Sequence, residues 1–88
     1  MALTRLLAVQ YGPKGIRVNC VCPGATAGEG MGSVFFDAEL GGPLVRYVPL
    51  RRAGQPAELG ATLVALLSDS TSYVTGQIIA VDGGATVR

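Results

Sequence analysis

Apolar residues near the amino terminus recur at helical spacing. Leu3, Leu6 and Leu7 occupy positions i, i+3 and i+4, which lie on one face of a helix. This pattern predicts a helix of about 10 residues. Gly12 and Pro13 are expected to end it, because glycine can adopt the left-handed conformation that terminates many helices and proline cannot continue one.

A second helix is predicted from Pro56 to about Ser68. Proline suits the first helical position, where its missing N–H would have no partner within the helix. Glu58 falls in the first turn, where the helix dipole favours a negative charge. The apolar face of this helix is expected to consist of four leucines, Leu59, Leu63, Leu66 and Leu67.

Two short apolar runs predict buried strands. The first run, residues 16–22, contains β-branched residues and becomes wholly apolar toward Pro23 and Gly24. The second run, residues 77–81, precedes another glycine-containing turn. The predicted order is helix, strand, long connection, helix, strand. A helix between two buried strands indicates a βαβ unit, with parallel strands and a right-handed crossover.

The connection over residues 25–54 is long for a compact domain, which is typical of lids and binding loops. Helical turns are expected in it around residues 33–40 and 42–47. Its apolar side chains have two interpretations: they pack the lid onto the core, or they line a pocket for an apolar substrate. These side chains are Phe35, Phe36, Leu40, Leu44 and Val45.

Composition and charge restrict the class of protein. The 88-residue chain is 49% hydrophobic and 15% charged, which indicates one folded segment over residues 1–88. Its net charge is +1 and its seven basic residues are scattered, so no nucleic-acid partner is expected. No apolar run is long enough to cross a membrane. Arg5 interrupts the only segment that resembles a signal peptide, so a cytoplasmic location is expected.

The cysteine and histidine content limits the chemistry. Cys20 and Cys22 share one strand face, where extended backbone holds them too far apart for easy bridging, and they are interpreted as small buried apolar residues. A metal site would need more ligands, so none is expected. The chain contains no histidine, which excludes the usual serine or cysteine triads.

Four segments, in this order and spacing, resemble the C-terminal part of a short-chain dehydrogenase/reductase. They are L-T-R-L-L-A from residue 3, I-R-V-N-C-V-C-P-G from residue 16, P-L-R-R-A-G-Q-P-A-E-L from residue 49 and T-G-Q-I-I-A-V-D-G-G from residue 75. The resemblance implies an α/β fold, the C-terminal portion of a Rossmann-like doubly wound parallel sheet. It also implies that the segment is incomplete as a domain, with the phosphate-binding part before Met1.

The resemblance further implies a cofactor, NAD or NADP, and hydride transfer between it and a carbonyl or alcohol substrate. The cofactor-binding residues carried over from the family are Pro23, Gly24 and Thr26. Gly28 stands where the family usually has a cofactor-contacting threonine, so that hydroxyl contact is absent. The substrate lid would contain Phe35, Phe36 and Leu40.

The family's catalytic Tyr-x-x-x-Lys pair is absent from this chain. Lys14 is the only lysine, Gln10 stands four residues before it, and Gly12-Pro13 interrupts any helix from Tyr11. The spacing of glycines at positions 24, 28 and 30 imitates a phosphate loop, but it follows the wrong strand of the family pattern. No catalytic residue is therefore assigned, and the chain alone is expected to be inactive.

The sequence also gives expectations about the partners of the chain and about the residues that anchor its loops. A homo-oligomer, or association with a fuller subunit, is expected through residues 59–67 and 77–81. The alternative function is a non-catalytic module that docks on full-length relatives through the same surfaces. Arg51 and Arg52 could bind a phosphate or carboxylate, although an ion pair or loop anchor is favoured for Arg52. Asp82 is interpreted as a turn former and hydrogen-bond anchor rather than a catalytic group.

Overall fold

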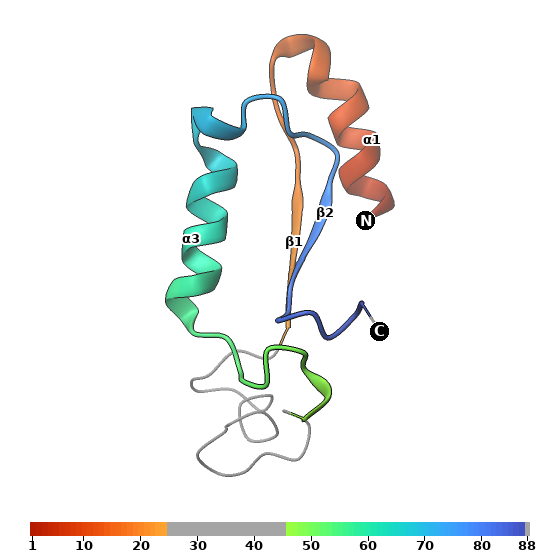
Figure 1. The fold of residues 1–88 in the computed structure, drawn as a ribbon. Coiled ribbons are helices and arrows are strands. Elements are labelled where there is room, and N and C mark those ends of the chain that lie inside the picture. Colours follow the sequence, from red (N-terminus) through yellow and green to blue (C-terminus); the bar gives the residue numbers. More distant parts are fainter. Residues whose placement is uncertain (25–45, 88) are drawn as a thin grey trace.

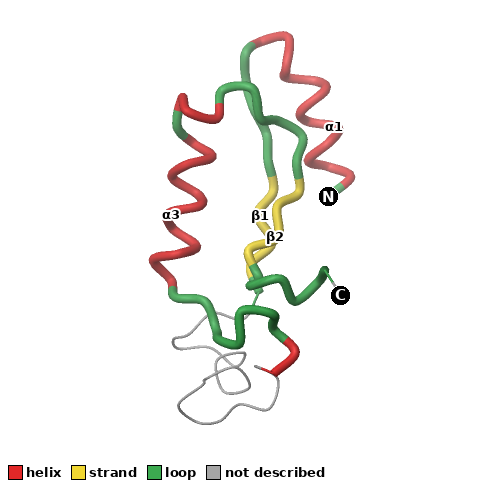
Figure 2. The backbone as a smooth tube through the Cα atoms, in the orientation of Figure 1, coloured by secondary structure: helices red, strands yellow, loops and turns green. Residues whose placement is uncertain are grey.

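The computed structural model describes residues 1–24 and 46–87 of the chain. Within these residues two α-helices lie on either side of a pair of strands (Figure 1). Figure 2 shows how short the strands are relative to the helices. The elements in chain order are α1 (Ala2–Tyr11), the 3-10 turn η1 (Gly12–Lys14), β1 (Cys20–Pro23), α3 (Pro56–Leu67), the 3-10 turn η3 (Asp69–Thr71) and β2 (Ile78–Val81).

Helix α1 has the predicted length, but it ends differently from the prediction. Gly12 has right-handed helical angles, φ −53° and ψ −44°, and the backbone continues through η1 with Pro13 in its first turn. The left-handed residue is Gly15, with φ 76°. Proline is tolerated at the start of a helical turn, so Pro13 tightens the helix end instead of stopping it at Gly12.

Strands β1 and β2 pair in parallel, as predicted. The register places Cys20 beside Ile78 and Pro23 beside Val81. The observed β1 is shorter at its start than the predicted residues 16–22, and β2 begins one residue later than expected. The α/β class and the parallel pairing are thus confirmed.

Side chains replace strand pairing ahead of β1. The Asn19 side chain donates to the Val74 carbonyl at 3.0 Å and accepts from the Gln77 backbone N–H at 3.1 Å. Nearby, the Val18 N–H donates to the Thr75 hydroxyl at 3.0 Å. Because these polar side chains take the place of ladder bonds, the regular strand begins only at Cys20.

Helix α3 begins within a closed hydrogen-bonded turn. Pro56 occupies the first helical position, and the Glu58 carboxylate accepts from the Gln55 backbone N–H at 2.9 Å. This bond reaches back over the first turn and satisfies a donor that the helix itself cannot. The predicted start at Pro56 is confirmed.

The carboxyl end of α3 is satisfied by side chains from two segments. The Thr71 and Ser68 hydroxyls donate to the Ala65 carbonyl at 2.9 and 2.8 Å. From the other side, the half-buried Arg17 guanidinium donates to the carbonyls of Ser68, Thr71 and Val74, at 3.1, 2.8 and 3.2 Å. A cation at this end also suits the helix dipole. Arg17 therefore fastens the segment before β1 to the end of α3.

The core within the described residues is small. Only Ala8, Val48 and Ala53 are buried among their apolar side chains. Ala8 lies against the turn before β2, where a Cβ added to Gly76 would be 3.4 Å from the Cβ of Ala8. On the leucine face of α1, Leu3 and Leu6 are 63% and 61% exposed, while Leu7 is half-buried.

Residues 25–45 lie outside the described part of the chain. The predicted turn around residues 33–40 and the predicted lid side chains therefore stay predictions. Of the second predicted turn, residues 46 and 47 are described, and they lie in a short helical turn. No helix among the described residues is long and apolar enough to cross a membrane.

Candidate functional site

A cavity of about 210 Å3 opens where the carboxyl ends of β1 and β2 meet. Ligands of open parallel sheets bind at this end of the strands. The end of β1, the turn after β2 and the segment before α3 all contribute to its wall. The lining residues are Cys22, Pro23, Gly24, Val48, Arg52, Ala80, Asp82, Ala85 and Thr86.

Gly24 brings the end of β1 against the end of β2. Its N–H donates to the Val81 carbonyl at 2.9 Å, which extends the parallel ladder by one bond. A Cβ added at this position would lie 2.6 Å from the Cβ of Asp82 and 2.8 Å from its Cα. Only glycine permits this approach, so the Pro23-Gly24 backbone is fixed at the mouth of the cavity.

Asp82 holds the turn that follows β2. Its carboxylate accepts from the Gly84 N–H at 2.9 Å, the Thr86 N–H at 3.1 Å and the Thr86 hydroxyl at 2.7 Å. The Thr86 hydroxyl first, and then the Gly84 N–H, lower the pKa of Asp82 below its usual value. The carboxylate is ionised and engaged in three bonds, which confirms its expected role as a hydrogen-bond anchor.

The segment leading to α3 packs directly on this turn. The Leu50 N–H donates to the Gly83 carbonyl at 3.2 Å, and Val48 is 3% exposed. A Cβ on Gly83 would lie 2.7 Å from Val48, and one on Gly84 2.9 Å from Pro49. The cavity floor is therefore built by residues 48–50 and residues 83–84, two segments that lie more than thirty residues apart in sequence.

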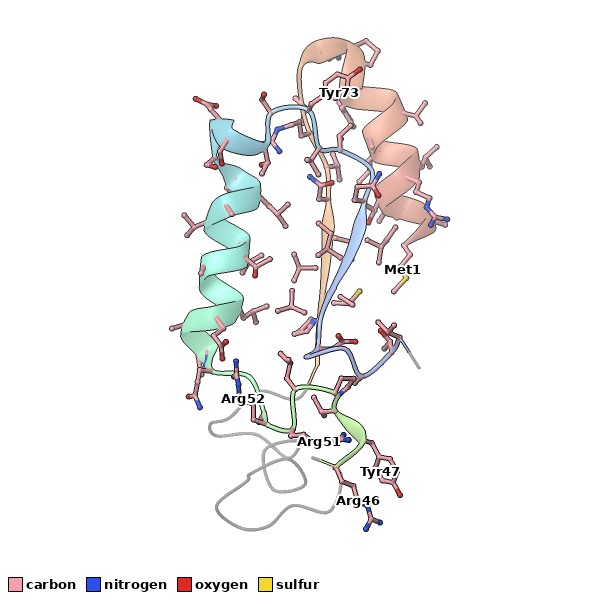
Figure 3. All side chains as sticks on the ribbon, viewed as in Figure 1. Met1, Arg46, Tyr47, Arg51, Arg52 and Tyr73 are labelled. Carbon is pink, nitrogen blue, oxygen red and sulfur yellow. The ribbon has the colours of Figure 1, made fainter. Side chains whose placement is uncertain are left out.

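Arg52 forms the ion pair that the sequence favoured. Its guanidinium donates to both oxygens of Glu58, at 2.6 and 2.8 Å. Hydrogen bonds from Arg52, then the backbone N–H of Gln55, lower the pKa of Glu58 to about 2, and Glu58 in turn raises the pKa of Arg52. Figure 3 shows Arg51 and Arg52 in the loop before α3. Arg51 is the one non-glycine among the described residues with positive φ, 58°.

These partners decide what the cavity can hold. Its two charged side chains already have partners. Arg52 is paired with Glu58, and Asp82 accepts hydrogen bonds from Gly84 and Thr86 in its own turn. The remaining wall is backbone and small apolar side chains, including Val48, Ala80 and Ala85. Such a wall suits a flat ring better than a phosphate, which would need unengaged donors or a cation.

No acid–base pair reaches this cavity from the described residues. Lys14 lies over the ring of Tyr11, with its Nζ 5.8 Å from the ring centroid. Both residues belong to the α1–η1 end of the molecule, at the amino end of β1 and away from Gly24 (Figure 1). The sequence alone shows that the chain contains no Tyr-x-x-x-Lys pair.

The structure describes two of the predicted site residues. Pro23 and Gly24 line the cavity together. Thr26, Phe35, Phe36 and Leu40 lie outside the described residues, and their roles stay predictions. Sequence analysis missed the contribution of Val48, Ala85 and Thr86. The signal for Thr86 was present in D-G-G-A-T, where an aspartate before a glycine turn selects donors a few residues ahead.

Another hollow, of about 530 Å3, lies between β1 and α3. Its wall is largely apolar and includes Val21, Leu63, Leu66 and Leu67. Arg17 also lines it, but its guanidinium is bound to the carbonyls beyond α3. Although larger, this hollow offers no converging reactive groups, so the cavity at the strand ends is the better candidate site.

Parallel strands joined through a helix, with a cavity at their carboxyl ends, define an α/β protein with a Rossmann-like arrangement. Residues 1–86 match the Enoyl-(Acyl carrier protein) reductase family, and the chain belongs to the short-chain dehydrogenase/reductase family. The family inferred from the sequence is therefore confirmed.

Two curated relatives of the chain are dehydrogenases. It is 39% identical over 89 residues to 2-(S)-hydroxypropyl-CoM dehydrogenase 3 of Xanthobacter autotrophicus, with 96% of this chain and 34% of the relative covered. It is 42% identical over 85 residues to the L-tagatose-forming galactitol 2-dehydrogenase of Cereibacter sphaeroides, with 97% and 34% covered.

Solved structures agree in fold. A Brucella melitensis 3-oxoacyl-[acyl-carrier protein] reductase with bound NAD matches at 37% identity and TM-score 0.79, covering 94% of this chain and 29% of that one. An Agrobacterium tumefaciens protein with bound NADP, provisionally assigned as a 2-deoxy-d-gluconate 3-dehydrogenase, matches at 33% and 0.86, covering 99% and 35%. The chain spans about a third of the length of these relatives.

Proposed function

We propose that this chain forms the C-terminal portion of the Rossmann-like sheet of an NAD(P)-dependent oxidoreductase. The observation that carries the proposal is the cavity at the ends of β1 and β2, with Pro23 and Gly24 at its mouth. The order of the elements, α1, β1, α3 and β2, supports it. NAD and NADP in two of the related structures support a nicotinamide cofactor in the family.

In this proposal the cavity holds the nicotinamide side of NAD or NADP. The backbone of Pro23 and Gly24, which packs against Asp82, would face the ring, and the bonds of Asp82 keep this wall in place. Val48, which is almost fully buried, excludes water from the floor. The cofactor, when bound, supplies or accepts the hydride exchanged with a carbonyl or alcohol.

The remaining assigned residues extend the same site. Thr26 follows Gly24 by two residues and would contribute backbone contacts to the cofactor, which need no particular side chain. Phe35, Phe36 and Leu40 would cover an apolar substrate as a lid. These four assignments come from the family pattern in the sequence.

The chain by itself is proposed to be inactive, because its sequence lacks both the phosphate-binding loop and the Tyr-x-x-x-Lys pair. The purified chain should give no oxidation of NADH or NADPH with a panel of small ketones and aldehydes. A Gly24→Val variant serves as the matched control for any trace rate. Turnover by the pure chain that this variant abolishes would contradict the inactivity.

The decisive experiment for the proposed function examines the polypeptide that the source cell makes. An antibody against residues 46–87 would recover it, and mass spectrometry would give its intact mass and the identity of any companion. We expect recovery either within a larger dehydrogenase polypeptide or with a subunit that supplies the missing part of the same sheet, and NAD(P)H-dependent carbonyl reduction in the recovered material. An inactive chain of this length recovered without such a subunit would contradict the proposal.

Association through α3 and β2 is proposed as well, either between copies of the chain or with a fuller subunit. Leu63, Val64 and Leu67 are 41%, 68% and 83% exposed along α3. A helix that is apolar on several faces is normally buried on those faces. The alternative function, a non-catalytic module that docks on full-length relatives, rests on the same surface. Co-purification with a complete, separately encoded dehydrogenase subunit would favour it.

A further inference from the structure

Two free thiols face each other on β1. The sulfur atoms of Cys20 and Cys22 are 3.9 Å apart, and both side chains are half-buried. They share one face because successive side chains of a strand alternate between faces. A rigid pair of strand positions, rather than a mobile loop, therefore sets the distance between the sulfurs.

This distance suits a shared metal ion better than a disulfide. Two thiolates bound to one zinc ion at about 2.3 Å, with tetrahedral angles, lie about 3.8 Å from each other. A disulfide instead needs sulfurs about 2.05 Å apart, and residues two positions along a strand lie at about 6.6 Å, near the long limit of Cα separation for such a bond. Closing the bond would distort the strand at the register pair of Cys22 and Ala80.

The surroundings leave room for an ion beside the sulfurs. Ala80 is the register partner of Cys22, carries only a methyl group and is exposed. Cys22 itself lines the cavity of about 210 Å3 at the strand ends. An ion held by the two sulfurs would therefore have space on the open side for water or another small ligand.

We propose that Cys20 and Cys22 together chelate one thiophilic d10 cation, Zn2+ or its analogue Cd2+. The two S–H bonds break, both protons pass to solvent, and two metal–sulfur bonds form, with no change in oxidation state. Solvent or an added ligand fills the other coordination positions, because the described residues contain no group of three or more metal-binding side chains. The site is open, unlike a closed structural zinc site.

The test titrates the reduced full chain with Cd2+ and follows the thiolate-to-metal charge-transfer absorption in the ultraviolet. One Cd2+ per chain is expected, with displacement by Zn2+. Cys20→Ser and Cys22→Ser should each weaken binding at least tenfold, and the double variant should abolish it. Equal binding by the wild type and either single variant would overturn the proposal, as would the absence of the absorption band.

A second measurement uses the wild-type chain alone, so its result does not depend on whether the variants fold. Saturating Cd2+ should protect both thiols of the wild type from alkylation by iodoacetamide, as read from the mass of the whole chain. Alkylation of one thiol in the presence of the ion would overturn chelation by the pair. Sedimentation at saturation distinguishes one chain per ion from a cation that bridges two chains, and bridging would also overturn it. Because neither experiment includes a nicotinamide cofactor, the result is independent of the proposed oxidoreductase function.

Discussion

At the residue scale, the absence of one side chain decides how closely the two strand ends approach. Gly24 lies against Asp82, and any Cβ there would overlap backbone and Cβ atoms that the strand pairing holds in place. The sequence marked Pro23-Gly24 as a strand end. It could not show that the glycine is needed for contact with a residue 58 positions away, because that contact depends on the parallel register.

Replacing Gly24 by alanine should lower the free energy of unfolding by about 1–3 kcal/mol, because the added methyl overpacks the strand ends. Gly60→Ala is the matched control, since a Cβ there meets no atom within 4 Å and the residue lies inside α3. The control should raise stability by about 0.5–1 kcal/mol. Urea unfolding followed by circular dichroism measures both, and a neutral Gly24→Ala would contradict the contact.

The Arg52–Glu58 pair gives a prediction about pH. The pKa of Glu58 is lowered from 4.5 to about 2, so the pair contributes stability above about pH 4.5. That contribution is lost as the pH falls through about 2. Arg52→Met should raise the pKa of Glu58 to a value between these two, because the Gln55 N–H still donates to the carboxylate.

Nuclear magnetic resonance titration of the Glu58 side-chain carboxyl measures this pKa directly. Arg51→Met is the control, since the Arg51 guanidinium donates to backbone carbonyls, including that of Val48 at 3.1 Å. It should leave the pKa of Glu58 near 2. An unchanged pKa in Arg52→Met would show that the ion pair does not set the titration.

At the element scale, the sequence predicted both α-helices and both strands of the described residues, but neither all of their limits nor the 3-10 turns η1 and η3. The start of β1 was wrong because Arg17 and Asn19 use their side chains to bind carbonyls and an N–H across the gap. Two polar residues inside the run I-R-V-N were the available signal. Periodicity alone could not reveal their partners, which lie more than fifty residues away.

Asn19→Ala should therefore destabilise the fold by about 1–2 kcal/mol, because it leaves the Val74 carbonyl and the Gln77 N–H without this partner. Gln77→Ala is a matched control at the same place, since its exposed side chain donates to the carbonyl of the nearby Thr75. This control should change stability by less than about 0.5 kcal/mol. Equal effects of the two substitutions in thermal unfolding would argue against the bridging role of Asn19.

At the scale of the whole molecule, hydrophobic patterning located the helices correctly but did not show which of their faces are covered. The leucines of α1 follow helical spacing, yet Leu3 and Leu6 are exposed. Periodicity shows that a face is apolar and says nothing about what packs on it. The same limit applies to the site: the family motifs located Pro23 and Gly24, while the floor around Val48 depends on packing between segments distant in sequence.

The exposed apolar side chains of α3 predict concentration-dependent association. A Val64→Ser, Leu67→Ser double variant should shift the midpoint of association at least tenfold toward higher concentration, because each residue buried on association contributes about 1–2 kcal/mol. Val9→Ser, at a residue 78% exposed on α1, is the control and should have a smaller effect. Sedimentation velocity over a range of concentrations measures the midpoints. Equal midpoints for all three proteins would exclude α3 as the interface.

The parallel register also bears on the order of events during synthesis. Cys20 pairs with Ile78, so the first strand leaves the ribosome 58 residues before its partner in this chain. Contacts of such long sequence separation slow folding, and an apolar strand that waits for them is prone to aggregate. The newly made chain should therefore depend on chaperones until residues 78–81 can pair, and persistent chaperone binding to a chain truncated before Ile78 would show that their pairing closes the sheet.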